Sequence, residues 1–134
     1  MTPPQSHAEE AREWLRLASR DLRMAELALG DAAPLVGEAL YHAQQAVEKA
    51  LKGFLVWNGM EYPLTHDVRK LLDLCGPFDP TLDAEMRAVA GLTQFAVRFR
   101  YPGEEEQPTP EEAQRWLDLA HRTCEVVRLR LRSE

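Results

Sequence analysis

A row of polar side chains that could bind a phosphorylated ligand lies along the segment 40–58, LYHAQQAVEKALKGFLVWN. At about 100° per residue, the apolar side chains of this segment fall on one side of a helix and the polar ones on the other. An ammonium group can pair with phosphate, and imidazole and amide groups can hydrogen-bond a base or a ribose. We therefore predict a nucleotide- or anion-binding strip here; the alternative is a solvated helix face with a Glu48–Lys52 ion pair. The candidate residues of this polar strip are Tyr41, His42, Gln45, Lys49 and Lys52.

A second candidate cluster, Arg98, Arg100 and Tyr101, lies at the end of a helix predicted over 80–100. Two guanidinium groups and a phenol ring could clamp an anion and stack on a base. The alternative is that cations at a helix C-terminus are favourable in any protein, because they face the negative end of the helix dipole. On a regular helix, residues two apart point in different directions, so we expect at most one of the two arginines to face the polar strip.

His66 completes the set of candidate binding residues, and it stands beside Asp67. This pair could suggest a metal site, but a metal needs three or four convergent ligands, and the chain has four histidines and two cysteines in all. The simpler interpretation is that residues 65–67 begin a short helix, with the carboxylate at the positive end of the helix dipole. We predict no metal and no cofactor.

Two common kinds of active site are excluded by the spacing of glycine and serine. The seven glycines are never closer than six positions apart, so no glycine-rich loop can place successive backbone N–H groups on a phosphate. The three serines are Ser6, Ser19 and Ser133, and none has the setting of a nucleophilic serine turn.

Length and charge limit the remaining classes. A chain of 134 residues fits one domain, 1–134, with its own core. A formal charge of −6 opposes binding of extended DNA, because that binding depends on neutralising phosphates. Two cysteines without CxxC spacing, together with the lack of a signal segment or a long apolar run, predict a soluble cytoplasmic protein that does not enter a membrane.

Helical periodicity and start signals predict an all-α fold. We expect an antiparallel up-and-down bundle of four main helices plus one short helix, because the main segments share a near-heptad spacing and the connections are short. A flexible N-terminus is expected over 1–6 and an exposed acidic loop over 103–109. The small residues Ala39, Ala46 and Gly53 form the predicted dimer surface. The predicted helices cover 7–29, 35–58, 66–74, 80–100 and a last segment from Pro110, with start signals at Ser6, Thr65, Asp79 and Thr109.

Four blocks of the sequence together resemble the HEPN domain (higher eukaryotes and prokaryotes nucleotide-binding). They are EWLRLASRDLRMAELAL at 13–29, HAQQAVEKALKGFL at 42–55, PLTHDVRKLL at 63–72 and RFRYPGE at 98–104. The resemblance implies a four- or five-helix bundle, usually a homodimer. It also implies a nucleotide- or RNA-binding module that acts beside a minimal nucleotidyltransferase, in a toxin–antitoxin-like pair.

Other members of the family are metal-independent ribonucleases that use an arginine, four to six arbitrary residues and a histidine. In this chain Arg98, Arg100 and Tyr101 match the region, but glutamates stand where the histidine is expected, so we assign no catalytic residue. Arg115 and His121 match this spacing in the sequence. On a continuous helix, however, a six-residue step turns the second side chain by about 240° from the first, so the two would not meet unaided. An endoribonuclease toxin and a non-binding dimeric helical scaffold are the alternative functions.

Overall fold

The protein is all-α, as predicted. The computed structural model describes residues 3–62, 64–95 and 108–132, and these contain helices without any strand. The candidate residues Arg98, Arg100 and Tyr101, and most of the predicted acidic loop 103–109, lie outside the described residues. The elements are α1 (Gln5–Gly30), α2 (Val36–Trp57), α3 (Val68–Cys75), α4 (Pro80–Met86), the 3-10 helix η1 (Arg87–Phe95) and α5 (Pro110–Arg130).

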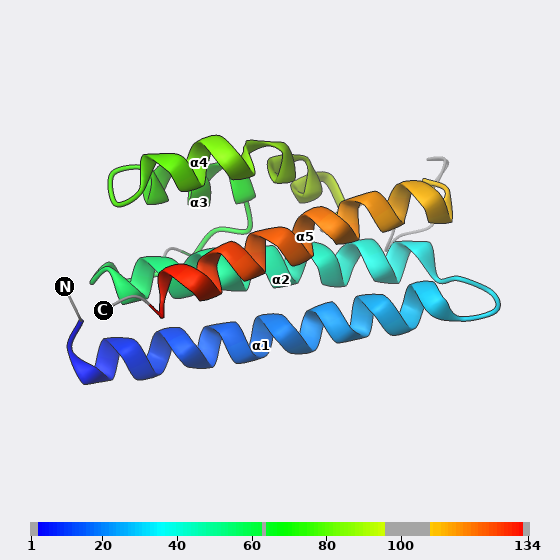
Figure 1. Cartoon of the computed structure of the whole chain (residues 1–134). Helices are drawn as coiled ribbons and strands as arrows, with labels where there is room; N and C mark the ends of the chain where they lie inside the picture. Colours follow the sequence, from blue (N-terminus) through cyan, green and yellow to red (C-terminus); the bar gives the residue numbers. More distant parts are fainter. Residues whose placement is uncertain (1–2, 63, 96–107, 133–134) are drawn as a thin grey trace.

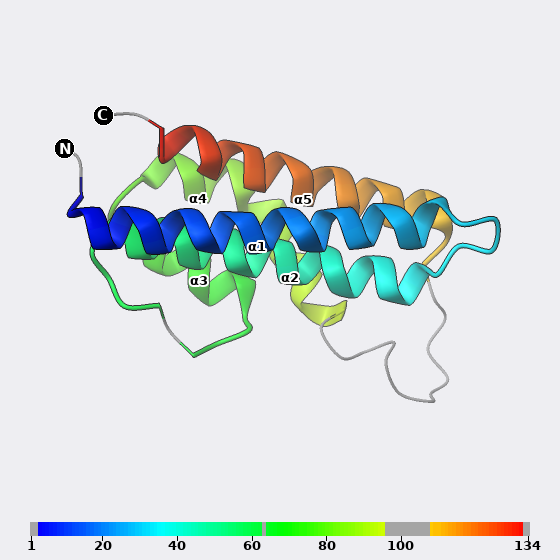
Figure 2. The ribbon, with the colours of Figure 1, turned by 90° about the horizontal axis from the view of Figure 1, so that it is seen from below.

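The three long helices lie side by side, and the short ones form a second layer over them (Figure 1). α1 and α2 form an antiparallel hairpin, and α5 runs in the same direction as α2 along both of them (Figure 2). α3, α4 and η1 cover the side of α2 and α5 that faces away from α1. Among residues 3–62, 64–95 and 108–132, none of the helices has the combined length and hydropathy of a membrane span.

α2 is the central helix, and its small residues pack inside the chain. A Cβ atom on Gly53 would lie 3.0 Å from Trp14 Cβ and 3.1 Å from the carbonyl oxygen of Ala11, both on α1. Ala39 and Ala46 are buried as well. The prediction that these small residues form a dimer surface is therefore wrong: they are buried inside the chain, and the helix that approaches Gly53 closely is α1 of the same chain.

Two of the predicted helix starts are confirmed in detail. Asp79 accepts hydrogen bonds from the backbone N–H groups of Thr81 and Leu82, and proline follows it at the first helical position. Thr109 and Glu112 form a capping box at the start of α5, each side chain bonding the other residue's backbone N–H. Such caps satisfy backbone donors that have no partner inside the helix.

The other two predicted start signals, Ser6 and Thr65, lie two residues away from the observed N-cap positions, Pro4 and Asp67. α1 begins at Gln5 after Pro4, without a side-chain cap, so Ser6 lies in the first turn and the predicted flexible segment 1–6 is partly helical. At α3 the cap is Asp67, whose carboxylate accepts from the backbone N–H of Arg69 at 3.0 Å. Thr65 instead accepts from the N–H of Asp67, which tightens the turn before the cap.

The predicted helix over 80–100 changes type inside the described region. It is α-helical only to Met86 and then continues as the 3-10 helix η1. Gly91 of η1 lies against the indole of Trp116 on α5, where a Cβ atom would approach Cη2 to 2.5 Å. Thr93 accepts a hydrogen bond from the backbone N–H of Val68 at 2.8 Å. Contacts with α5 and α3 therefore hold this segment in a geometry that local propensity does not predict.

Arg130 ties the end of α5 to the start of α4, and this contact gives a pH-dependent prediction. Burial raises the pKa of the Asp79 carboxyl, but hydrogen bonds from Arg130 and Thr81 and the Arg130 charge outweigh it, so the pKa lies below its usual value. A lowered carboxyl pKa contributes stability above the unfolded value of about 3.9, and the contribution is lost as pH falls through the folded pKa.

Replacing Arg130 with alanine is expected to lower the free energy of unfolding by about 1 kcal/mol at pH 7. The difference in the free energy of unfolding between wild type and variant should shrink below about pH 4, as Asp79 becomes protonated in both proteins. Urea unfolding at pH 7 and at pH 3 measures this difference. Arg128→Ala is the control, because Arg128 pairs with exposed Glu125 on the same helix. An Arg130→Ala effect that did not change with pH would contradict the assignment.

Candidate functional site

A carboxylate on α1 brings together two of the predicted binding residues of α2. Asp21 Oδ1 lies 2.8 Å from His42 Nδ1, and Asp21 Oδ2 accepts a hydrogen bond from Lys49 Nζ at 2.6 Å. Asp21 is 8% exposed, whereas His42 and Lys49 are half-buried. The carboxylate acts as acceptor for Nδ1–H, so the Nε2 atom of His42 remains for another partner. Both side chains are thereby held in fixed positions at the surface.

These residues line a hollow between α1 and α2 with a volume of about 360 Å³. Arg20 and Arg23 of α1 line it too, and both are exposed. Together with Lys49 they supply three cations against the single charge of Asp21, so the hollow is locally positive although the protein carries −6. Such a hollow can accept an anion, because phosphate pairs with ammonium and guanidinium groups. Its apolar lining is formed by Leu17, Met24 and Leu27. We call this site the α1–α2 hollow.

Two further candidates belong to a second polar cluster, in which Glu48 is the acceptor. Glu48 Oε2 accepts from Lys52 Nζ at 3.0 Å and lies 2.8 Å from His66 Nδ1, and Oε1 accepts from the Gln44 amide at 3.0 Å. Gln44 also donates to the backbone carbonyl of His66 at 3.2 Å. Glu48, Lys52 and Gln44 are buried, whereas the His66 side chain is 74% exposed.

The expectation that Lys52 lies on an open polar strip is therefore wrong. It is 6% exposed, and its ammonium lies 5.9 Å from the centroid of the Trp14 ring and 5.8 Å from that of Tyr62. The predicted Glu48–Lys52 pair is present, but it is buried rather than solvated. The segment between α2 and α3 covers this part of α2. Lys52 has no room for a ligand without movement of that segment.

The remaining predicted residues of α2 lie between the two clusters. Tyr41 is half-buried, and its ring meets the His42 ring edge-on, with centroids 5.3 Å apart. Gln45 is half-buried and donates to the Gln44 side-chain oxygen at 3.4 Å. Both are near enough to His42 or Lys49 in sequence to border a ligand in the α1–α2 hollow, though neither lines it.

The arginine and histidine of RWLDLAH do not form a pair. α5 is continuous from Pro110 to Arg130, so the six-residue step turns their side chains apart, as expected. His121 Nε2 instead lies 2.6 Å from Glu26 Oε2 on α1. Arg115 is exposed. The structure thus gives no support to catalysis by these two residues acting together.

The sequence interpretation did not include Asp21, Arg20 or Arg23 in the site. A signal for Asp21 was present: it lies three residues after Ala18 and four before Ala25, on the side of α1 that faces the core. A charged residue at such a position needs a partner, because burying an unpaired charge is costly. The two arginines carry no comparable signal, since arginines on an exposed helix face are common.

The described residues offer neither a metal site nor a reactive thiol. Within residues 3–62, 64–95 and 108–132, no three His, Cys, Asp or Glu side chains gather in a way that could hold a metal ion. Cys75 and Cys124 are free and buried, and burial raises the pKa of each thiol to about 12. Both are therefore protonated at neutral pH and are poor nucleophiles.

Comparisons with known proteins agree with the four sequence blocks. The model of the HEPN domain family matches residues 11–130. The crystal structure of TT1696 from Thermus thermophilus is similar to this chain, with 30% sequence identity and a TM-score of 0.73 over 88% of this chain and 95% of that one. No curated protein matches. The family match extends from the first turns of α1 to the end of α5, and the chain therefore belongs to the HEPN domain family.

Proposed function

We propose that this HEPN protein binds a nucleotide or a short RNA through its phosphate groups in the α1–α2 hollow. The observation that carries the proposal is the pairing of Asp21 with both His42 and Lys49 beside two exposed arginines. Because Asp21 fixes the imidazole and the ammonium, little side-chain entropy is lost when they meet an anion. Membership of the HEPN family supports a nucleotide- or RNA-related ligand.

The size and charge of the hollow favour a small ligand over an extended one. A volume of about 360 Å³ lies at the lower end of the range for small-molecule sites. A net charge of −6 opposes the long-range attraction that extended nucleic acid needs. The binding set in this proposal is Arg20, Arg23, His42 and Lys49, with Tyr41 and Gln45 at its border. Lys52 is left out because it is buried, and Arg98, Arg100 and Tyr101 lie outside the described residues.

The family also supports a proposal about partners and location. We propose a cytoplasmic homodimer that acts with a minimal nucleotidyltransferase in a toxin–antitoxin-like pair, in line with its HEPN membership. Sedimentation of the purified protein tests the dimer, and a monomer at micromolar concentration would overturn that part. Co-purification with a nucleotidyltransferase encoded beside it tests the pair.

Removing one cation from the hollow is expected to weaken ligand binding. Lys49→Met and Arg20→Met should each raise the dissociation constant for ATP or for a ten-nucleotide single-stranded RNA by roughly tenfold, about 1.4 kcal/mol. For the RNA, the slope of log affinity against log salt should fall in magnitude by about 0.7 for each phosphate group that the variant no longer neutralises. Titration calorimetry and fluorescence anisotropy measure the two quantities.

Lys70→Met is the matched control, because Lys70 is an exposed lysine on α3 away from the hollow. Its affinity should equal that of the wild type. If all three variants bound alike, or if the wild type bound neither ligand, the hollow would not be the site. Gel analysis of the RNA after incubation without divalent metal separates the enzyme alternative, since shortened RNA would favour an endoribonuclease and intact RNA a binding module.

A further inference from the structure

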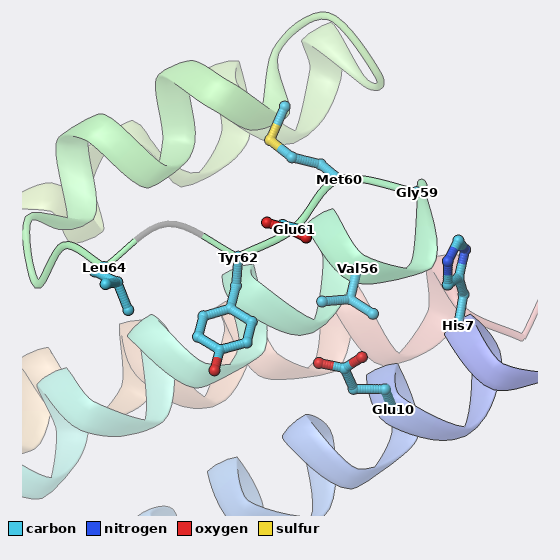
Figure 3. A pocket seen from close by; sticks show the side chains of 8 residues that line it. All are labelled: His7, Glu10, Val56, Gly59, Met60, Glu61, Tyr62 and Leu64. Atoms are coloured by element: carbon cyan, nitrogen blue, oxygen red, sulfur yellow. The ribbon is translucent and has the colours of Figure 1, made fainter.

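A second hollow, with the opposite charge, lies at the other end of the α1–α2 hairpin. It is formed by the first turns of α1, the end of α2 and the segment that leaves α2 at Gly59, and its volume is about 450 Å³. In Figure 3, Val56 lies between Glu10 of α1 and the segment that carries Glu61 and Tyr62, whereas the Met60 side chain points away from Val56. Gly59 has φ of +89°, a backbone conformation that suits glycine and turns the chain back over α2. The lining residues are His7, Glu10, Val56, Gly59, Met60, Glu61, Tyr62 and Leu64.

The two carboxylates of this hollow have no partners in the part of the chain that the structure describes. Glu10 and Glu61 are exposed, and neither carboxylate makes a hydrogen bond or an ion pair there. The Nδ1 atom of His7 is buried without a hydrogen-bond partner among the described residues. Elsewhere on the surface, by contrast, Glu13 pairs with Arg16 and Glu125 with Arg128. Two unpaired carboxylates beside one cavity leave a site for a cation.

The apolar lining of the hollow favours a cation that carries an apolar stem. Val56 is 4% exposed, and Tyr62 is held in place by an edge-on contact with Trp14, with ring centroids 4.9 Å apart. Leu64 is 92% exposed and Tyr62 is 39% exposed, so two large apolar side chains beside the cavity leave apolar surface that a partner could cover. An arginine side chain matches these features: its stem is apolar, and its guanidinium pairs with carboxylates and stacks on aromatic rings.

We propose that this hollow docks an arginine of a partner protein, with an apolar residue beside it packing on Leu64. The partner segment therefore carries an arginine next to an apolar residue. Arginine is a frequent anchor at the centre of protein interfaces because it combines these contacts. A nucleic acid does not fit, since the two carboxylates would repel its phosphates. This second hollow lies near the N-terminus of α1. Asp21 of the α1–α2 hollow is 11 residues after Glu10 on the same helix, a distance of about 16 Å, so a ligand can occupy each hollow at the same time.

An NMR titration of the isotope-labelled chain with a peptide tests the proposed arginine docking. The probe is the peptide acetyl-Leu-Arg-Leu-Arg-Leu-amide, followed by backbone amide shifts, and the comparison peptide carries glutamate in place of both arginines. The arginine peptide should shift the amides of Gly59 to Tyr62 with a dissociation constant of about 1 mM or tighter. The glutamate peptide should shift none of them.

The double variant Glu10→Gln/Glu61→Gln should raise the dissociation constant for the arginine peptide by roughly tenfold. The control Asp73→Asn/Glu111→Gln removes the same charge from two other exposed positions and should bind as the wild type does. Equal binding by both double variants, binding of the glutamate peptide, or no shifts up to about 10 mM arginine peptide would each overturn the proposal. So would shifts of the same amides by a ten-nucleotide RNA, which would make the hollow a nucleic-acid contact.

Discussion

Replacing Glu48 with alanine is expected to lower the free energy of unfolding by about 3–5 kcal/mol, because it leaves a buried ammonium without its countercharge. Lys52 is 6% exposed and has its ion pair with Glu48 at 3.0 Å. The same substitution removes one of the two acceptors of the buried Gln44 amide, which keeps its bond to the His66 carbonyl, and the acceptor of the exposed His66 ring. The lost bond of the buried amide adds to the cost. Chemical unfolding at pH 7 measures the change.

A double replacement separates the charge effect from the loss of packing. Glu48→Leu/Lys52→Met removes both charges and keeps apolar bulk, and it is expected to cost far less than Glu48→Ala, since apolar replacements of buried ion pairs are often nearly neutral. The exposed pair on α5 provides the control: Glu125→Ala should change the free energy of unfolding by about 0.5 kcal/mol or less. If Glu48→Ala cost no more than Glu125→Ala, the pair would be solvated and the segment after α2 would not cover it.

The helix starts show how much of the fold can be predicted from sequence. Asp79 with Pro80, and Thr109 with Pro110 and Glu112, are local signals, since a cap bonds backbone groups only two or three residues away. Long amphipathic segments are similarly local, and they predict the long helices to within a few residues. The all-α class follows from these patterns alone.

The site depends on contacts that local patterns do not contain. Asp21 meets His42 and Lys49 from positions 21 and 28 residues away in the chain. Periodicity places the two α2 residues on one face but does not say which side chain of α1 faces them. For Lys52, the sequence pattern predicts an exposed polar position on the helix. In the structure, a later segment covers Lys52, and Glu48 neutralises its charge. Whether a polar helix face is open is a property of the whole fold.

The change from α4 to η1 also depends on contacts between distant parts of the chain. One of these contacts, between Gly91 and Trp116, leads to a prediction. Alanine is normally the better helix former, by about 1 kcal/mol over glycine. At this position, however, an added Cβ would lie 2.5 Å from Cη2 of Trp116 and 3.3 Å from Cζ3. Gly91→Ala is therefore expected to lower the free energy of unfolding by about 1–3 kcal/mol, because η1 or the indole must move to make room. Urea unfolding measures the loss.

A double-mutant cycle shows whether the indole is the cause. Trp116→Leu shortens the side chain that meets Gly91, so Gly91→Ala should cost less in that background, with an interaction energy of at least about 0.5 kcal/mol. Gly30→Ala is the control, since a Cβ atom there meets nothing within 4 Å. Gly30→Ala should not lower the free energy of unfolding. A stabilising Gly91→Ala would mean that η1 does not pack against α5 as described, and the Thr93 contact that joins η1 to the start of α3 would then need another support.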